Sequence, residues 1–167
     1  MRKILYVTTL YVLTYICSME IGQEIKQGKF KSEYQKLGIN IAFTSSWMER
    51  QIAQQLKPHK LTAQQFNILR ILRGQQPNPA TINLLTERML DKNSNASRLV
   101  DKLVKKEFAS RQECPADRRQ VDVAITKKGL DLLAKLDKEE EEWAGKLKVL
   151  SAPEAKELNR LLDKLRG

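Results

Sequence analysis

The sequence predicts a mainly α-helical fold with one small β-hairpin. Apolar residues recur at spacings of three, four and seven along most of the chain, which is the periodicity of amphipathic helices. The period changes to strict alternation after residue 108 and returns to the helical one after residue 126. A chain of 167 residues is long enough to bury one sizeable core. We therefore expect a single folded domain over residues 19–167.

Two helices are expected in the first half of this domain. The first spans residues 30–56, and one face of it carries Phe30, Tyr34, Leu37, Ile41, Met48, Ile52 and Leu56. The segment 57–60, with Pro58 in it, ends that helix. Thr62 is a suitable N-cap for the second helix, which ends at Gly74 and has a core face of Phe66, Leu69 and Leu72.

A helix-turn-helix follows. Asn78 with Pro79 after it predicts the start of a helix that runs to about Leu90, with Ile82, Leu85 and Met89 facing the core. The polar turn 91–94 separates it from a helix over residues 94–107, which Asn93 or Ser94 would cap. Two helices joined by a short turn form this motif.

Two alternating strands are expected next, over residues 109–114 and 120–125, and the turn between them carries Arg118 and Arg119 at its tip. This hairpin, residues 109–125, makes the motif winged. Residues 61–126 are thus expected to form a winged helix-turn-helix.

Two more helices end the chain. Thr126 caps a long helix that begins at Lys127 and reaches about Lys148, and Ser151 with Glu154 forms a capping box before a last helix. The last helix aligns four leucines with no obvious partner in the winged domain: Leu158, Leu161, Leu162 and Leu165. We therefore expect the helices within 30–56 and 127–166 to build a homodimer.

The charge distribution indicates a polyanionic partner. The chain has 30 Lys and Arg residues against 20 Asp and Glu, a formal net charge of +10, which would suit a nucleic acid or an anionic membrane surface. Eight basic and four acidic residues lie within residues 92–120. Basic side chains on the helix 94–107 suit the major groove and its phosphates, and arginines at the wing tip suit the minor groove. Duplex DNA is therefore the expected partner.

Enzymatic function is not expected. The chain has one histidine, His59, and lacks a glycine-rich phosphate loop, a GxSxG motif and paired carboxylates outside a helix surface. Cys17 and Cys114 lie far apart without CxxC spacing, so neither a disulfide nor a zinc site is indicated. No catalytic residue, metal ligand or cofactor is assigned.

Residues 1–18 are expected to lie outside the fold. Arg2 and Lys3 precede an apolar run over residues 4–17, as in a secretory signal, but a cut after Ser18 would place bulky Ile16 at the minus-three position. The run is also shorter than the about 20 apolar residues that span a membrane. Three interpretations remain open: a mis-assigned start with Met19 as the initiator, a native extension, and a working signal.

The segment ASRLVDKLVKKEFASRQECPADRRQVDVAITKKGLDLL at 96–133, together with LTAQQFNILRIL at 61–72, resembles the MarR family of bacterial transcription regulators. The resemblance covers about residues 30–166. It implies a homodimer with interlocked first and last helices, two DNA-reading lobes, and a cleft for a small-molecule effector between the dimerisation and DNA-binding parts. One departure is Phe108, where the family commonly has glycine at the end of the recognition helix.

The expected function is thus a cytoplasmic transcription repressor that binds operator DNA. The expected DNA-binding residues lie on the recognition helix 94–107, just before it, and in the wing: Asn93, Ser94, Asn95, Ser97, Arg98, Lys102, Lys105, Arg118 and Arg119. Asp101 and Asp117 are expected to orient the wing through a carboxylate–arginine contact, with Arg119 as the arginine. The alternative function is a secreted or membrane-surface basic helical protein, directed there by the N-terminal run.

Two further hypotheses concern regulation. Trp47, on the first helix, is the candidate for lining the effector cleft, although packing in the core or the dimer would also suit an aromatic residue there. Cys114 lies beside the wing turn, where its oxidation would alter DNA binding; Arg111 and Arg118 are the neighbours that would favour its thiolate.

Overall fold

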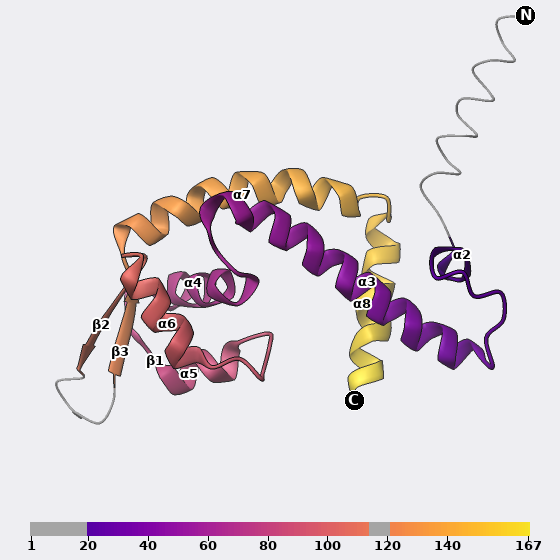
Figure 1. Ribbon diagram of the computed structural model, residues 1–167, viewed down its shortest axis with the longest axis horizontal. Coiled ribbons are helices and arrows are strands. Elements are labelled where there is room, and N and C mark those ends of the chain that lie inside the picture. The colour runs from indigo at the N-terminus through magenta and orange to yellow at the C-terminus, as the bar shows by residue number, and fades with distance from the viewer. Residues whose placement is uncertain (1–19, 114–120) are drawn as a thin grey trace, which may run out of the picture. The chain divides into compact units, whose positions relative to one another are not determined.

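The computed structural model describes residues 20–113 and 121–167 and confirms the predicted fold class (Figure 1). Helices account for most of these residues, and a three-stranded antiparallel sheet completes the fold. The chain divides into two compact units, with the boundary between Ile52 and Ala53. None of the helices in the described ranges has both the length and the apolar composition needed to cross a membrane.

The first unit contains a short helix and most of a long one. Helix α2 spans Ile21–Glu24, and Ile21 is buried. Helix α3 spans Glu33–Leu56, so it begins three residues later than predicted. Lys36 Nζ lies 2.5 Å from Glu20 Oε1 and 5.7 Å from the centre of the Phe30 ring. These contacts tie the segment before α3 to its first turn.

The second unit begins with the last turn of α3 and a short 3₁₀ helix, η1 (Lys57–His59). Helix α4 then spans Ala63–Gln75, and Thr62 forms the predicted cap as part of a capping box with Gln65. The helix continues one residue past Gly74. The buried face is Gln65, Ile68, Leu69, Ile71 and Leu72, whereas the predicted core residue Phe66 is only half-buried.

The prediction of a helix start at Asn78 and Pro79 was wrong. Ala80–Thr81 instead forms strand β1, which pairs with the third strand of the sheet, and the buried Ala80 lies opposite Val123. Helix α5 (Ile82–Arg88) begins only after this strand, where the Thr81 hydroxyl accepts the Leu84 amide at 3.2 Å. Pairing with a sheet that is distant in sequence overrides the local Asn-Pro preference.

The helix predicted over residues 94–107 is shorter than expected. Helix α6 spans Ala96–Lys105, not residues 94–107, and its N-cap is Asn95, not Asn93 or Ser94. Asp91 accepts hydrogen bonds from the amide of Asn93 and the hydroxyl of Ser94, so residues 91–94 form a turn of their own before the helix can begin.

The sheet has the order β1–β3–β2 and contains the predicted hairpin. Strand β2 spans Ala109–Glu113 and β3 spans Val121–Ile125, with Ala109 opposite Ile125 and Arg111 opposite Val123. Of the alternating side chains predicted to face one side, Val123 and Ile125 are buried and Val121 is half-buried. The wing turn 115–119 lies outside the described residues.

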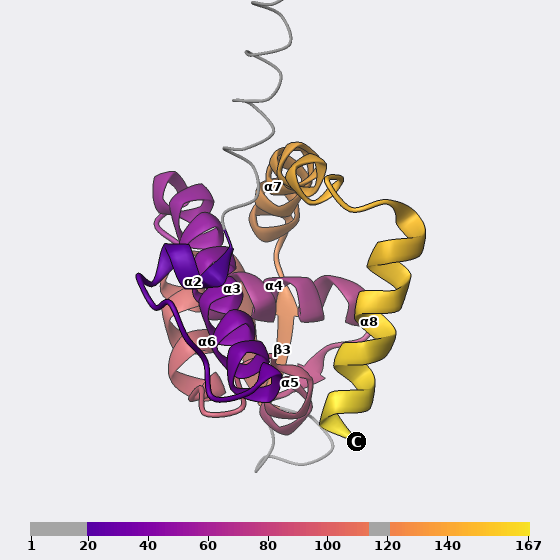
Figure 2. The same cartoon turned by 90° about the vertical axis from the view of Figure 1, so that its right-hand side faces the viewer.

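The core of the second unit lies where α4 packs against α6, β3 and the long helix α7, which spans Lys127–Leu147. Figure 2 shows this arrangement from the side. Its fully buried side chains come from every element around it: Leu56, Ile68, Leu69, Leu72, Leu85, Met89, Val100, Leu103, Val123, Leu133 and Leu136. Burying each such side chain stabilises the fold by about 1.5–3 kcal/mol.

The two C-terminal helices follow the prediction closely. Helix α7 spans Lys127–Leu147 and α8 spans Ala152–Arg166. Arg73 on α4 binds the Asp137 carboxylate on α7 through two nitrogens, at 2.6 and 3.1 Å. No residue of α8 is buried, and its leucines stay at least partly exposed.

Candidate nucleic-acid interface

Helix α6 has one buried face and one charged face. Ala96, Val100 and Leu103 are buried in the core. The exposed residues on the other side are Arg98, Asp101, Lys102 and Lys105. They recur at spacings of three and four and therefore form one contiguous surface with more positive than negative charge. The sequence predicted this surface, and the structure brings its residues together.

Asp91 organises the turn that leads into α6. Its carboxylate accepts hydrogen bonds from Ser94 Oγ at 2.7 Å, from the Asn93 amide at 3.1 Å and from Gln64 Nε2 at 3.5 Å. The Ser94 hydroxyl first, then the Asn93 amide and Gln64, hold the pKa of Asp91 below its ordinary value of 3.8. Sequence reasoning treated 91–94 only as a polar turn, although an Asp three residues before a Ser was a usable signal.

The two ends of this turn are held by asparagines. Asn67 Oδ1 on α4 accepts the Leu90 amide at 3.0 Å, which fixes the start of the turn. Asn95 Oδ1 accepts the Arg98 amide at 3.0 Å, which caps α6. Asn67 was missed from the sequence because its partner lies 23 positions away. The polar residues at the N-terminus of α6 are therefore placed by side-chain contacts at both ends.

Helix α6 is linked to strand β2 by an ion pair. Asp101 Oδ1 lies 2.5 Å from Arg111 Nη1, and their side chains are 50% and 37% exposed. At that exposure the pair contributes only about 0–1 kcal/mol to folding. The expected partner Arg119 lies outside the described residues, as do Asp117, Arg118 and Cys114. The sequence identified the carboxylate but not Arg111 as its partner.

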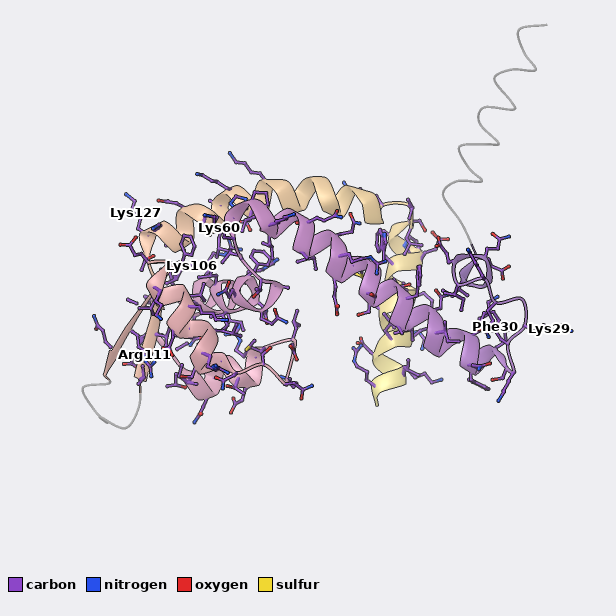
Figure 3. The ribbon with its side chains drawn as sticks, in the orientation of Figure 1. Lys29, Phe30, Lys60, Lys106, Arg111 and Lys127 are labelled. Atoms are coloured by element: carbon purple, nitrogen blue, oxygen red, sulfur yellow. The ribbon has the colours of Figure 1, made fainter. Side chains whose placement is uncertain are left out.

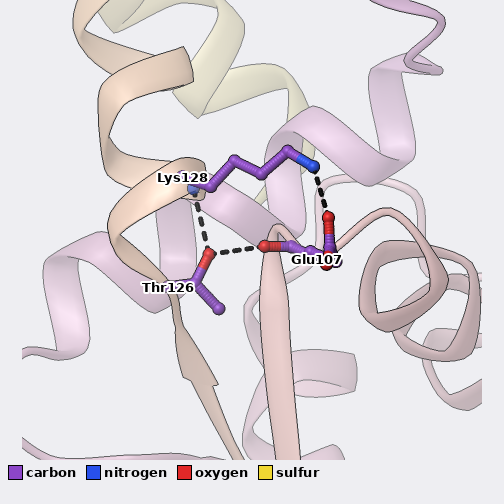
Figure 4. A network of polar contacts seen from close by, with 4 residues as sticks. Glu107, Thr126 and Lys128 are labelled. Atoms are coloured by element: carbon purple, nitrogen blue, oxygen red, sulfur yellow. Dashed lines mark hydrogen bonds and ion pairs between the residues drawn. The ribbon is translucent and has the colours of Figure 1, made fainter.

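The C-terminal end of α6 meets the start of α7 in a network of polar contacts (Figure 4). The Thr126 hydroxyl donates to the Glu107 carbonyl at 2.7 Å and accepts the Gly129 amide at 3.1 Å. Lys128 Nζ donates to Glu107 Oε2 at 2.6 Å, and this hydrogen bond, with the charge of Lys128, holds the pKa of Glu107 below its ordinary value.

The backbone at this junction adopts the left-handed conformation at Glu107, with φ of 63°. Phe108 is the position where the MarR resemblance implies a glycine, but its φ is not positive. The position that favours glycine is thus one residue earlier than expected, and a glutamate occupies it.

Lys106, at the end of α6, contacts the loop between α3 and α4. Its Nζ donates to the Lys60 carbonyl at 2.5 Å and to Gln65 Oε1 at 3.2 Å. Figure 3 shows Lys60 and Lys106 close together above α4, with Arg111 further down on β2. These contacts could not be predicted from the sequence, because Lys60 lies 46 positions from Lys106.

An open cavity of about 530 Å³ lies beside the first turns of α7. Its lining comes from three separate segments: His59, Phe108, Lys127, Lys128, Asp131, Leu132 and Lys135. Trp47, the predicted effector residue, is half-buried on α3 and is not among these residues. Periodicity within single helices could not have identified a cavity assembled in this way.

Comparison with known proteins places this geometry in a family. The MarR family model matches residues 61–121, which run from the start of α4 to β3. No curated protein shows significant sequence similarity to the chain. Three solved structures illustrate the similarity. A MarR transcription factor from Planctomyces limnophilus is 30% identical with a TM-score of 0.63, and the alignment covers 81% of this chain and 98% of that one.

A mutant MarR from E. coli in complex with operator DNA is 25% identical with a TM-score of 0.68, covering 83% of this chain and 99% of that one. A MarR-like transcription regulator from Bacillus cereus shares the fold at 18% identity with a TM-score of 0.71, covering 80% and 96% of the two chains. Each alignment extends well beyond the winged motif into the flanking helices. The chain therefore belongs to the MarR family of winged helix-turn-helix transcription regulators.

Proposed function

We propose that the chain is a transcription repressor that binds operator duplex DNA as a homodimer. The observation that carries this proposal is the exposed basic face of α6, whose N-terminus is capped by Asn95 and preceded by the turn that Asp91 organises. In this proposal α6 lies in the major groove and the wing, residues 109–125, contacts the adjacent minor groove. The E. coli MarR structure in complex with operator DNA supports this assignment.

The residues of α6 take different roles. Arg98, Lys102 and Lys105 meet phosphates and base edges, because their long side chains are exposed on one face. Asn93 and Ser97 add polar groups at the N-terminal end of the helix. Ser94 and Asn95 each use one group within the protein, yet the Ser94 hydroxyl oxygen can still accept a hydrogen bond and the Asn95 amide nitrogen can still donate one.

The wing supplies the second contact. Arg118 and Arg119 are proposed to enter or flank the minor groove, whose negative potential attracts arginine. Asp101 keeps its proposed role of orienting the wing and exerts it through Arg111, while Asp117 is proposed to act within the turn.

The homodimer is proposed to form through the helices within 30–56 and 127–166. Apolar side chains on α3 and α8 are exposed in the single chain: Tyr34, Leu37, Leu158, Leu161 and Leu165. A surface of this kind on helices outside the core fits a partner chain. Two-fold symmetry would then place two copies of α6 at half-sites about one helical turn of DNA apart.

Selection of bound sequences from random duplex DNA tests the function, and a palindromic site is the expected product. Arg98→Ala should then weaken binding to that site in fluorescence anisotropy, whereas Arg160→Ala, which removes an exposed arginine of α8 paired with Glu157, should not. Failure to enrich any sequence, or wild-type affinity in Arg98→Ala, would contradict the proposal.

Regulation by a small-molecule effector is also part of the proposal, with Trp47 as the residue that would report its binding. Titration of candidate ligands should quench Trp47 fluorescence and release DNA, and Trp47→Phe should abolish the quenching.

Operator binding requires the protein in the cytoplasm of a bacterial cell, and cell fractionation would detect secretion instead.

A further inference from the structure

Lys106 differs from the other lysines of the α6 region. Lys102 and Lys105 are exposed, and no hydrogen bond or ion pair involves their ammonium groups within the described residues. Lys106 is half-buried, and its ammonium group is 2.5 Å from the Lys60 carbonyl and 3.2 Å from Gln65 Oε1. Two of the three donors of Lys106 are thus already used inside the protein.

The two acceptors of Lys106 are a buried side-chain amide and the carbonyl of a residue with a left-handed backbone. Gln65, only 2% exposed, is the one buried polar residue that the described part of the chain contains, and its Oε1 also accepts the Thr62 amide at 3.2 Å. Lys60 has a left-handed backbone with φ of 54° and closes the loop by donating its amide to the Lys57 carbonyl. A buried amide oxygen and a loop carbonyl therefore share one cation.

Lys106 and Glu107 together form what we call the α6 anchor. Lys106 is bound to the loop that connects α3 to α4, and Glu107 is bound to Thr126 and Lys128 at the junction between β3 and α7. These two connections lead from the winged motif to the helices before and after it. The two residues that follow the recognition helix therefore contact both connections.

We propose that Lys106 is a positioning residue for DNA recognition and not a phosphate contact. It fixes the C-terminal end of α6 to the loop between α3 and α4, so that the helix angle is set before DNA binds. The inference rests on the proposed function for its DNA readout. Of the eight basic residues within 92–120, Lys106 is therefore one that holds the protein together and does not contact DNA.

The test compares Lys106→Met with Lys105→Met, its exposed neighbour. Anisotropy is measured on the selected duplex and on a scrambled duplex over a salt series. Lys106→Met removes both hydrogen bonds of the ammonium group and should weaken binding to the selected duplex about tenfold. Its salt slope and its affinity for the scrambled duplex should not change. Lys105→Met should weaken both duplexes and lower the slope by about 0.9.

A lower salt slope in Lys106→Met, with equal loss on both duplexes, would overturn the inference, as would wild-type affinity. If Lys106→Met does not fold, Lys106→Arg makes the same comparison. Arginine keeps the charge that a phosphate contact needs but presents its donors in a planar fork, so wild-type binding by Lys106→Arg would also overturn the inference.

Hydrogen exchange on the DNA-free protein separates this inference from the proposed function. Lys106→Met should speed amide exchange in residues 60–62 and in the last turn of α6, and Lys105→Met should not. Unchanged exchange in both variants would overturn the anchor. A wild-type protein that bound selected and scrambled duplexes equally would instead overturn the proposed function.

Discussion

Gly129 lies directly against the main-chain carbonyl of Phe108. A Cβ on Gly129 would stand 2.3 Å from that oxygen and 2.8 Å from Ile125 Cγ1. Gly129 follows Lys127 and Lys128 in the first turn of α7, and this close approach explains why the residue there is a glycine. The first turn of α7 can pack on Phe108, the residue before β2, only if this position has no side chain.

Gly129→Ala should therefore destabilise the protein, by about 1–3 kcal/mol, because a main-chain atom must move to make room. Urea denaturation followed by circular dichroism measures this change. Gly145→Ala in the same helix is the matched control, since its Cβ would meet nothing within 4 Å. The control should be neutral or slightly stabilising. Equal stability of the two variants would contradict the packing described.

The Asp101–Arg111 pair should affect DNA binding more than stability. Asp101→Asn and Arg111→Met should each change the free energy of unfolding by less than about 1 kcal/mol, because both side chains are partly exposed. In operator binding a double-mutant cycle should give a coupling energy of about 0.5–1 kcal/mol. Additive effects would show that the pair does not orient the wing.

The turn before α6 should loosen in acid. Because the pKa of Asp91 is lowered in the folded protein, the stability its carboxylate contributes is fully present above the unfolded value of about 3.8 and is lost as the pH falls through the lower folded pKa. An NMR titration of the Asp91 carboxyl should give a midpoint below 3.8.

Ser94→Ala should move that midpoint upward, because the Ser94 hydroxyl is the largest cause of the shift. Ser97→Ala, which removes a hydroxyl that does not contact Asp91, should leave the midpoint unchanged. If both variants titrate like the wild type, the hydrogen bond from Ser94 is not what lowers the pKa.

The leucine face of α8 should be required for the homodimer. Leu161→Asp with Leu162→Asp should give monomer or unfolded protein in sedimentation, because charges would replace apolar surface at the proposed interface. Lys156→Asp, on the opposite side of the helix, should leave the dimer intact. A dimer that survives the double leucine substitution would place the interface elsewhere.

The sequence predicted the elements whose signals are local. Thr62, Thr126 and the Ser151–Glu154 pair were identified as caps, and the structure confirms the hydrogen bonds at all three places. The two strands were predicted to within one residue of their bounds. Caps and alternation need only a few neighbouring residues, so the sequence was sufficient at these places. It was not sufficient at Asn78 or at Asn93 and Ser94, where other contacts decide where the helix begins.

Contacts between distant segments were not predictable. Strand β1 depends on Val123, more than 40 positions later, and Lys106 contacts Lys60 and Gln65, which lie 46 and 41 positions away. At the candidate site the charged face of α6 was predicted, whereas Asn67, Arg111 and the lysine anchor were not. Spacing along a helix reveals its exposed face but not which side chain from another element will meet it.

The sheet order also affects how the protein avoids aggregation. Strand β2 is at an edge, so one row of its backbone groups has no partner within the sheet. Such an edge can pair with a strand of another molecule. Here the edge is only five residues long, is polar at Ser110 and Gln112, and carries Arg111, which Asp101 holds in place. The Asp101–Arg111 ion pair thus also keeps a charge where an intruding strand would have to bury it.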